Sequence, residues 1–181
     1  VGSGKSTIGK LLSGLYTQDT GEILLDNTDI RNYPVAELRS AIAYVAQETE
    51  LFSGSLRENI LLAHPERAEQ LETAIKVSGV AAFVGTHPMG LDMNVGERGR
   101  SLSGGQRQAV GLARMIISNP RVIYLDEPTS QMDRNTESQM VIGLKNWLSP
   151  DKTVLIATHR NSLLSLVDRL IVIDAGRIIA D

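Results

Sequence analysis

A lysine and two hydroxyl residues follow a glycine-rich turn at the start of the chain. Residues 1–7 read VGSGKST, which matches the end of the phosphate-binding pattern G-x-x-x-x-G-K-[ST]. Glycines let backbone N–H groups approach phosphate oxygens closely, and a following helix adds its positive N-terminal end. We expect Lys5 to reach the β- and γ-phosphates of a nucleotide, Ser6 to ligate Mg²⁺ and Thr7 to support the α-phosphate. The predicted backbone cradle consists of Gly2, Ser3, Gly4 and Lys5.

Two carboxylates end a hydrophobic run later in the chain. Residues 121–127 read RVIYLDE and predict a strand that stops before Pro128, because proline cannot donate to a ladder. In a phosphate-binding fold such a strand presents its aspartate to the metal, so Asp126 is a second predicted Mg²⁺ ligand. Glu127 lies where the strand ends, and we expect it to polarise the attacking water as a general base. Together the two motifs predict a P-loop nucleotide site that hydrolyses its ligand.

The elements that must position these residues alternate along the chain. Apolar periodicity predicts strands over 41–46, 121–125 and 153–157, helices over 6–15, 104–118, 134–148 and 160–167, and hairpins over 21–30 and 170–180. Strands alternating with helices predict an α/β fold of the P-loop NTPase class, with a mostly parallel sheet flanked by helices. Helical segments over 55–62, 65–78 and 80–84 interrupt this alternation. We therefore expect residues 55–118 to form a helical subdomain inside a single domain, 1–181.

Composition excludes several classes of protein. The chain has 181 residues, 42% of them hydrophobic and 22% charged, which suits one packed domain. Its net charge of −3 comes with no basic block, so nothing indicates binding to nucleic acid. The absence of cysteine excludes a disulfide framework and a thiolate metal site. No apolar run reaches the length of about 18 residues that a transmembrane helix needs.

A further motif narrows the class. Residues 102–106 read LSGGQ and open the helix predicted over 104–118. On its own this is a serine N-cap before a helix. The order and spacing of the P-loop, LSGGQ and YLDE, however, resemble the nucleotide-binding domain of an ABC (ATP-binding cassette) transporter over essentially the whole chain. The resemblance implies that a partner domain's ATP is contacted by Ser103, Gly104, Gly105 and Gln106. Two domains would then enclose two ATP molecules head to tail.

Three smaller elements fit the same resemblance. Gln47 follows a predicted strand and is similar to the Q-loop glutamine, which implies a role in sensing the γ-phosphate through Mg²⁺ and water. His159 follows the last core strand and is similar to the switch histidine, which implies contact with the γ-phosphate and Glu127. Residues 130–133 read SQMD where the family usually has SALD, so the D-loop departs at two positions and keeps Asp133.

Two segments resemble exporters in particular. Residues 95–99 (VGERG) resemble the X-loop, which in exporters touches the coupling helices of transmembrane domains, and residues 51–60 (LFSGSLRENI) also look exporter-like. The overall resemblance is greatest to ATPases of bacterial type I secretion systems. It implies ATP-driven transport, a transmembrane domain fused upstream, and a place on the cytoplasmic face of the inner (plasma) membrane. It implies no nucleic-acid partner.

The first residue lies inside the P-loop pattern, whose first glycine would stand two residues before Val1. We therefore expect a chain truncated at its N-terminus, without the strands before the P-loop and without the aromatic residue that stacks on adenine in this family. The expected missing strand is central, so its loss would expose apolar edges. A piece consisting of these residues alone is predicted to be poorly soluble and to bind ATP weakly.

Two alternatives remain open. One is a soluble ABC-family ATPase that acts on nucleic acid or the ribosome. The interval between Lys5 and Ser103 has no heptad repeat, which argues against members with a long inserted coiled coil. The other is a non-catalytic cassette in an asymmetric dimer. The retention of Lys5, Gln47, Ser103, Asp126, Glu127 and His159 argues against that second alternative.

Overall fold

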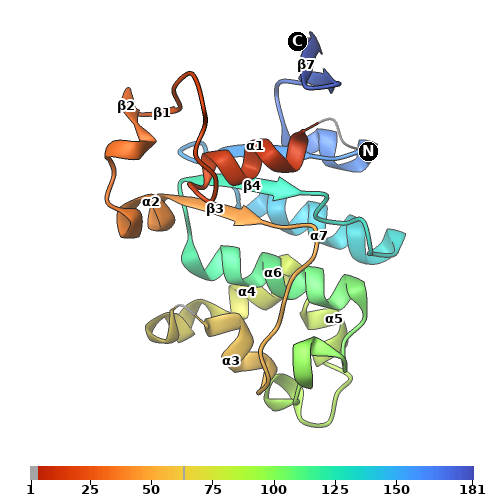
Figure 1. Cartoon of the computed structure of the whole chain (residues 1–181). Coiled ribbons are helices and arrows are strands. Elements are labelled where there is room, and N and C mark those ends of the chain that lie inside the picture. The colour runs from red at the N-terminus through yellow and green to blue at the C-terminus, as the bar shows by residue number, and fades with distance from the viewer. Residues whose placement is uncertain (1–3, 63) are drawn as a thin grey trace.

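The computed structural model describes residues 4–62 and 64–181, and a parallel sheet lies at its centre (Figure 1). The strands of this sheet, in spatial order, are β3 (Ile42–Val45), β4 (Val122–Asp126) and β5 (Thr153–Ala157). Val45 is paired with Leu125, and Leu125 with Ile156. The carboxyl ends of the strands therefore meet at one edge. This confirms the predicted α/β fold with a parallel sheet.

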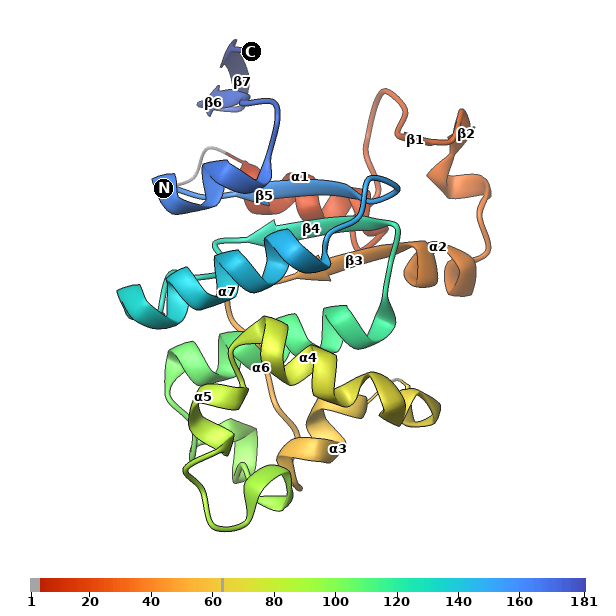
Figure 2. The same ribbon diagram turned by 180° about the vertical axis from the view of Figure 1, so that it is seen from behind.

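Helices pack on both faces of the sheet. The α-helices are α1 (Lys5–Leu12), α2 (Val35–Ala41), α3 (Leu56–Leu61), α4 (Leu71–Ser78), α5 (Ala81–Val84), α6 (Gly104–Ser118) and α7 (Arg134–Trp147). Short 3₁₀-helices span Ile30–Asn32, Pro65–Gln70, Gly90–Asp92, Glu97–Gly99 and Asn161–Leu166. Helix α1 lies on one face of the sheet, and α6 and α7 lie on the other (Figure 2). Among the described helices, none combines the length and apolar character that crossing a bilayer needs.

One apolar core joins the sheet to the helices beneath it. Leu112 and Ile116 of α6 are almost completely buried, as are Ile123 and Leu125 of β4, and all belong to the same cluster. Burial of one such side chain stabilises the fold by roughly 1.5–3 kcal/mol. Leu56 of α3 belongs to this cluster too. The helical lobe and the sheet are therefore held together by a shared core.

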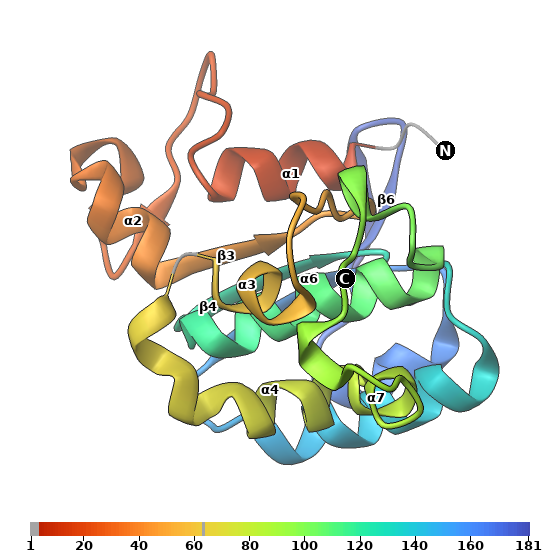
Figure 3. The ribbon, with the colours of Figure 1, turned by 90° about the horizontal axis from the view of Figure 1, so that it is seen from below.

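The helical lobe lies on the side of α6 away from the sheet, where α3 and α4 pack against it (Figure 3). A capping box begins the lobe: the Ser55 hydroxyl accepts from the Glu58 N–H at 3.1 Å, and the Glu58 carboxylate accepts from the Ser55 N–H at 2.7 Å. Two helix-start donors are satisfied in this way, so the first turn of α3 is fixed locally.

Both predicted hairpins are confirmed. The first joins β1 (Leu24–Leu25) to β2 (Thr28–Asp29), and the second joins β6 (Val172–Asp174) to β7 (Arg177–Ala180). The turn residues Asp26 and Asn27 have φ values of 49° and 62°. Positive φ at both central positions is the geometry that twists two strands into a tight hairpin, and asparagine and aspartate tolerate it. The second hairpin forms a two-stranded sheet of its own.

Two predicted helices are corrected. Residues 160–167 form a 3₁₀-helix over Asn161–Leu166 instead of an α-helix, and Asn and Ser residues there favour local alternatives to the α-helical ladder. The segment 65–78 is a 3₁₀-helix followed by α4, with a break at Arg67. The guanidinium of Arg67 turns instead to the last carbonyls of α6, at Ile117 (3.0 Å) and Ser118 (2.8 Å).

Helix α1 approaches the sheet closely at Gly9. A Cβ atom at this position would lie 2.6 Å from the ring of Tyr124 and 2.7 Å from that of Tyr44. The two rings are 5.9 Å apart between centroids and form the surface on which α1 rests. The absence of a side chain at Gly9 thus sets the height of the P-loop helix above the sheet.

We predict that Gly9→Ala lowers stability by about 1–3 kcal/mol, because the added methyl overpacks this contact. The midpoint of denaturant unfolding, compared with the wild-type protein, measures the effect. Gly85→Ala is the matched control: Gly85 has a φ of −62° at the end of α5 and its nearest contact is a backbone oxygen at 3.3 Å. That variant should change stability by no more than about 0.5 kcal/mol. Equal stability of the two variants would contradict the close contact.

Candidate functional site

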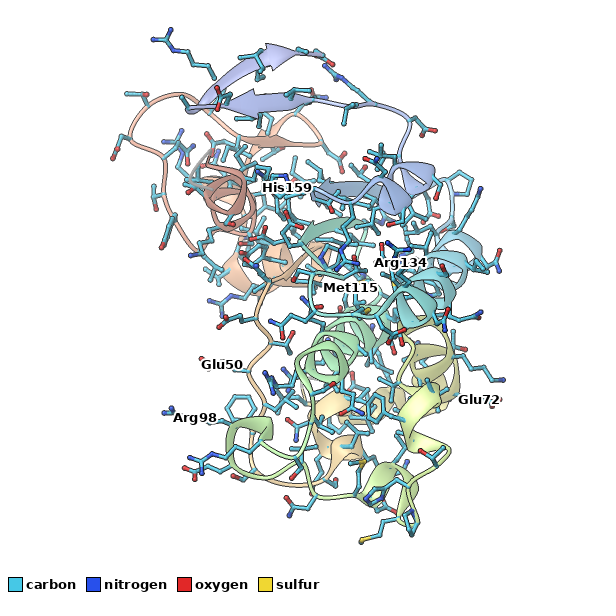
Figure 4. The ribbon with its side chains drawn as sticks, turned by 90° about the vertical axis from the view of Figure 1, so that its right-hand side faces the viewer. Glu50, Glu72, Arg98, Met115, Arg134 and His159 are labelled. Carbon is cyan, nitrogen blue, oxygen red and sulfur yellow. The ribbon has the colours of Figure 1, made fainter. Side chains whose placement is uncertain are left out.

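The predicted functional residues gather at the carboxyl edge of the parallel sheet. Gln47 lies two residues beyond β3, Glu127 directly follows β4, and His159 lies two residues beyond β5. The N-terminal end of α1 lies at the same edge (Figure 1). Figure 4 views this edge, with His159 near the sheet and Arg98 far from it on the helical lobe. The sheet register therefore brings together residues that are far apart in the sequence.

The P-loop helix begins at Gly4, whose φ of 92° is in the left-handed region that glycine adopts without strain. Among the described residues no side chain caps α1, and its first turn carries no acidic residue. First-turn N–H groups of this kind suit an anion, since they add to the positive end of the helix dipole. The carbonyl of Lys5 accepts a hydrogen bond from Tyr124 at 2.6 Å, which ties the helix start to β4. Ser6 and Thr7 are exposed at this end, whereas Gly2 and Ser3 lie outside the described residues.

Asp126 ends β4 as a buried carboxylate, with 3% of its surface exposed. Its Oδ2 accepts a hydrogen bond from the Tyr44 hydroxyl at 3.0 Å. Burial, together with this bond, raises the pKa of Tyr44 to about 12. The phenol therefore stays protonated at neutral pH and remains a donor to the carboxylate.

The oxygen donors at this edge fit Mg²⁺ by type. Asp126 supplies a carboxylate, Ser6 a hydroxyl and Gln47 an amide oxygen. Mg²⁺ prefers hard oxygen ligands and is usually held through one or two carboxylates together with substrate phosphates. Within the described residues no cluster of three or more His, Cys, Asp or Glu side chains forms a metal cage.

The backbone of Glu127 is held by a hydrogen bond to β5, and its side chain lies close to His159. Its φ of 47° is unusual for a residue with a side chain. Its N–H donates to Ala157 of β5 at 2.8 Å, which holds the strand end in the sheet. The Nε2 atom of His159 lies 3.5 Å from Glu127 Oε1, and the two side chains are 71% and 15% exposed. The carboxylate is therefore largely covered, and the imidazole beside it is exposed.

The LSGGQ segment forms a capped helix start. Ser103 Oγ accepts from the Gln106 N–H at 3.2 Å, and Gln106 Oε1 accepts from the Ser103 N–H at 2.8 Å. The simple N-cap interpretation is thus confirmed as local structure. Gln131 packs on the glycines, since a Cβ on Gly104 would lie 1.6 Å from its Oε1. Helix α6 lies across the sheet from α1, so the structure places the two predicted phosphate-binding segments on opposite faces (Figures 1 and 2).

Sequence reasoning missed an ion pair next to His159 that joins a partly exposed arginine to a buried glutamate. Arg160 pairs with Glu137 of α7, which is 6% exposed and also accepts from the Ser162 hydroxyl. A second nitrogen of Arg160 donates to the Ser130 carbonyl at 3.2 Å. The segment that carries His159 is therefore anchored to α7 and to the D-loop. The only sequence signal for this ion pair was a glutamate within an amphipathic helix. That pattern is too common to predict a buried carboxylate.

Gln108 was missed as well. It is 2% exposed on α6, and its side-chain amide contacts the segments that carry Gln47 and Glu127. A signal was present: Gln108 lies four residues before Leu112, on the apolar stripe of the helix, where a polar side chain must find partners.

Comparison with known proteins shows to which family the chain belongs. The model of the ABC transporter family matches residues 1–130. The chain belongs to the ABC transporter family. A solved structure of a bacterial Atm1-family ABC exporter with ATP bound superposes with a TM-score of 0.93 at 34% identity, and covers 99% of this chain and 32% of the exporter chain. The fold is therefore that of an ABC nucleotide-binding domain, as predicted.

Similar proteins carry the names of export ATP-binding/permease proteins and of a flippase. The chain is 41% identical to an ATP-dependent lipid A-core flippase of Vibrio parahaemolyticus, over 98% of its length. It is 40% identical to a putative multidrug export ATP-binding/permease protein of Staphylococcus aureus, over 98% of its length, and 36% identical to a putative export ATP-binding/permease protein of Rickettsia bellii, over 99%. It spans 31% of the length of each. None of these names refers to type I secretion, so that narrower resemblance stays a prediction.

We predict that Arg160→Ala lowers stability by about 2–3 kcal/mol, because it leaves the buried Glu137 carboxylate without its cation. Denaturant unfolding measures the change. Arg169→Ala is the control, since Arg169 pairs with Asp181 at the surface, where the two side chains are 71% and 43% exposed. It should leave the unfolding midpoint unchanged. Similar losses in both variants would mean that burial of Glu137 is unimportant.

Proposed function

We propose that residues 1–181 form one ABC ATPase domain that hydrolyses ATP, with residues 55–118 as its helical subdomain. One observation carries the proposal: Glu127 directly follows β4, next to buried Asp126, and its carboxylate lies 3.5 Å from the His159 imidazole. A carboxylate at the sheet edge where the P-loop helix begins can act as a base for water that attacks a phosphate.

Each residue has a distinct role in the proposed reaction. Gly2, Ser3 and Gly4 supply N–H groups to the phosphates, Lys5 places its ammonium at the β- and γ-phosphates, and Thr7 supports the α-phosphate. Glu127 takes a proton from the attacking water. His159 contacts the γ-phosphate and keeps the Glu127 side chain oriented.

The residues that would hold Mg²⁺ are Ser6, Gln47 and Asp126. The metal, when bound, neutralises charge on the phosphate oxygens. Tyr44 fixes the Asp126 carboxylate from behind through its 3.0 Å hydrogen bond. Gln47 lies on the segment between the sheet and the helical lobe, where it would respond to the γ-phosphate.

A second ABC ATPase domain, a copy or a paralogue, is proposed as the partner. Ser103, Gly104, Gly105 and Gln106 would contact the γ-phosphate of the nucleotide on that partner, and the two domains would close head to tail. Support comes from the position of α6 across the sheet from α1 (Figure 2). In this arrangement the phosphate is bound in one of two ways. Either the Ser103–Gln106 capping box opens and frees the serine hydroxyl, or the box stays closed and the glycine N–H groups contact the phosphate.

Coupling to export is proposed from the relatives, which are named as export ATP-binding/permease proteins and a flippase. The transmembrane domain is expected in the same full-length protein, since the chain matches about a third of each relative. The X-loop segment 95–99 and a cavity of about 500 Å³ beside β3 and α6 are candidate contacts for it. These names support the exporter proposal over the alternative of a nucleic-acid or ribosome ATPase.

The full-length protein is expected at the cytoplasmic face of the inner (plasma) membrane. We predict that it sediments with membranes and resists extraction by high salt, which removes proteins held by charge alone. Release into the soluble fraction by salt would contradict a fused transmembrane domain and would favour a separate subunit.

We predict that Glu127→Gln lowers ATP turnover by on the order of 10²–10⁴ and leaves ATP binding nearly intact, because only the base is lost. Phosphate release and binding of a fluorescent ATP analogue, both measured on the full-length protein with Mg²⁺, test this. Chelation of Mg²⁺ should abolish turnover in the wild-type protein.

Two further variants make that test specific. Glu69→Gln changes an exposed glutamate of the helical lobe and should hydrolyse ATP at the wild-type rate. Lys5→Ala should weaken ATP binding itself. Wild-type turnover by Glu127→Gln would remove Glu127 from the role of general base.

A further inference from the structure

Gln108 occupies a position where three segments of the site meet. It projects from the buried side of α6, four residues after the start of the helix, and its surface is 2% exposed. Its Nε2 donates to the Gln47 carbonyl at 3.1 Å and to the Glu127 carbonyl at 3.2 Å. One buried side chain therefore contacts the backbone of two proposed site residues that are 80 positions apart in the sequence.

The D-loop completes this set of contacts. Gln108 Nε2 lies 2.9 Å from Ser130 Oγ, and its Oε1 accepts from the Gln131 N–H at 3.0 Å. The two Nε2 hydrogens are shared among three acceptors, so the group adapts to small shifts of each segment. The amide thus uses both of its ends on segments that follow β3 and β4.

The position of Glu127 depends on two supports. On one side its N–H is held by β5, through the 2.8 Å bond to Ala157. On the other side its carbonyl is held by α6, through Gln108. The LSGGQ segment begins α6. A displacement of that helix start would therefore also displace Glu127 and Gln47, through the Gln108 side chain. A carboxylate displaced by about 1 Å from the attacking water loses on the order of 10²-fold in rate.

We propose that Gln108 is a positioning residue that links the orientation of the LSGGQ helix to the placement of Glu127 and Gln47. Its polar contacts are to the Gln47 and Glu127 carbonyls and to the D-loop. Its effect is on the hydrolysis step, through the backbone of the residues that carry the chemistry. This inference rests on the proposed ATPase function.

The test compares Gln108→Met and Gln108→Ala with a matched variant, Asn59→Ala, in the full-length protein. Asn59 is also a 2% exposed amide with bonds to backbone, but its partners are Phe52, Ser55 and Arg114 in the helical lobe. The midpoint of thermal unfolding, kcat and KM for ATP are measured for each variant. Gln108→Met keeps the side-chain volume and so preserves packing if the alanine variant folds poorly.

We expect both Gln108 variants to lower kcat by roughly 10- to 100-fold, with KM for ATP within about threefold of the wild-type value. Asn59→Ala should lower the unfolding midpoint by about as much as Gln108→Ala does. Its kcat should stay within about threefold of the wild-type value. In a Glu127→Gln background, Gln108→Ala should add little further loss, because residues that act through one another are not additive.

Each outcome is decisive. Equal kcat values for the Gln108 variants and Asn59→Ala would show that Gln108 is structural only, and the inference would fail. A fully additive loss in the Glu127→Gln background would equally overturn action through Glu127. If the wild-type protein does not hydrolyse ATP, the proposed function fails. This case is distinguished from the first two because turnover of the wild-type and Glu127→Gln proteins is compared directly.

Discussion

The burial of β4 between its two neighbouring strands is the constraint on which the site depends. Ile123 and Leu125 point into the core and are at most 1% exposed, so the register of the strand cannot slip without exposing them. That register fixes where Asp126 and Glu127 emerge relative to the ends of β3 and β5. The geometry of the proposed site is therefore a consequence of apolar packing in the same strand.

Beyond the ends of the strands, polar contacts hold the segments of the site in position. Tyr124 ties the P-loop helix to β4, Gln108 ties α6 to two strand ends, and Arg160 ties the histidine segment to α7. Each of these bonds is directional and reaches a backbone or a single carboxylate, unlike the apolar core that it borders. Segments held in this way keep a defined position, yet they exchange partners at lower cost than a repacking of the core.

Much of this arrangement was predictable from the sequence, because the P-loop, YLDE and LSGGQ encode local geometry as well as chemistry. Helix α6 and strand β5 have the predicted boundaries, since strong periodicity and clear breakers such as Asn119–Pro120 mark them. The apolar stripe of α6 indicated that Gln108 is buried. The partners of Gln108 and Glu137 were not predictable, because these contacts join segments whose separation depends on the completed fold. The 3₁₀-helix after His159 was predicted as an α-helix, because the apolar periodicity outweighed the local effect of its Asn and Ser residues in that prediction.

The placement of the two helix starts has a consequence for the assembly. Helices α1 and α6 both begin at the carboxyl edge, but the parallel sheet lies between them (Figure 1). A nucleotide held at Gly4–Thr7 therefore has the sheet between itself and the LSGGQ segment of the same chain. If both segments are to bind one phosphate, the LSGGQ segment must come from another domain. Gln108 connects α6, the helix that LSGGQ begins, with the backbone of Glu127 and Gln47. In the proposed head-to-tail pair, this contact would link the two nucleotide sites.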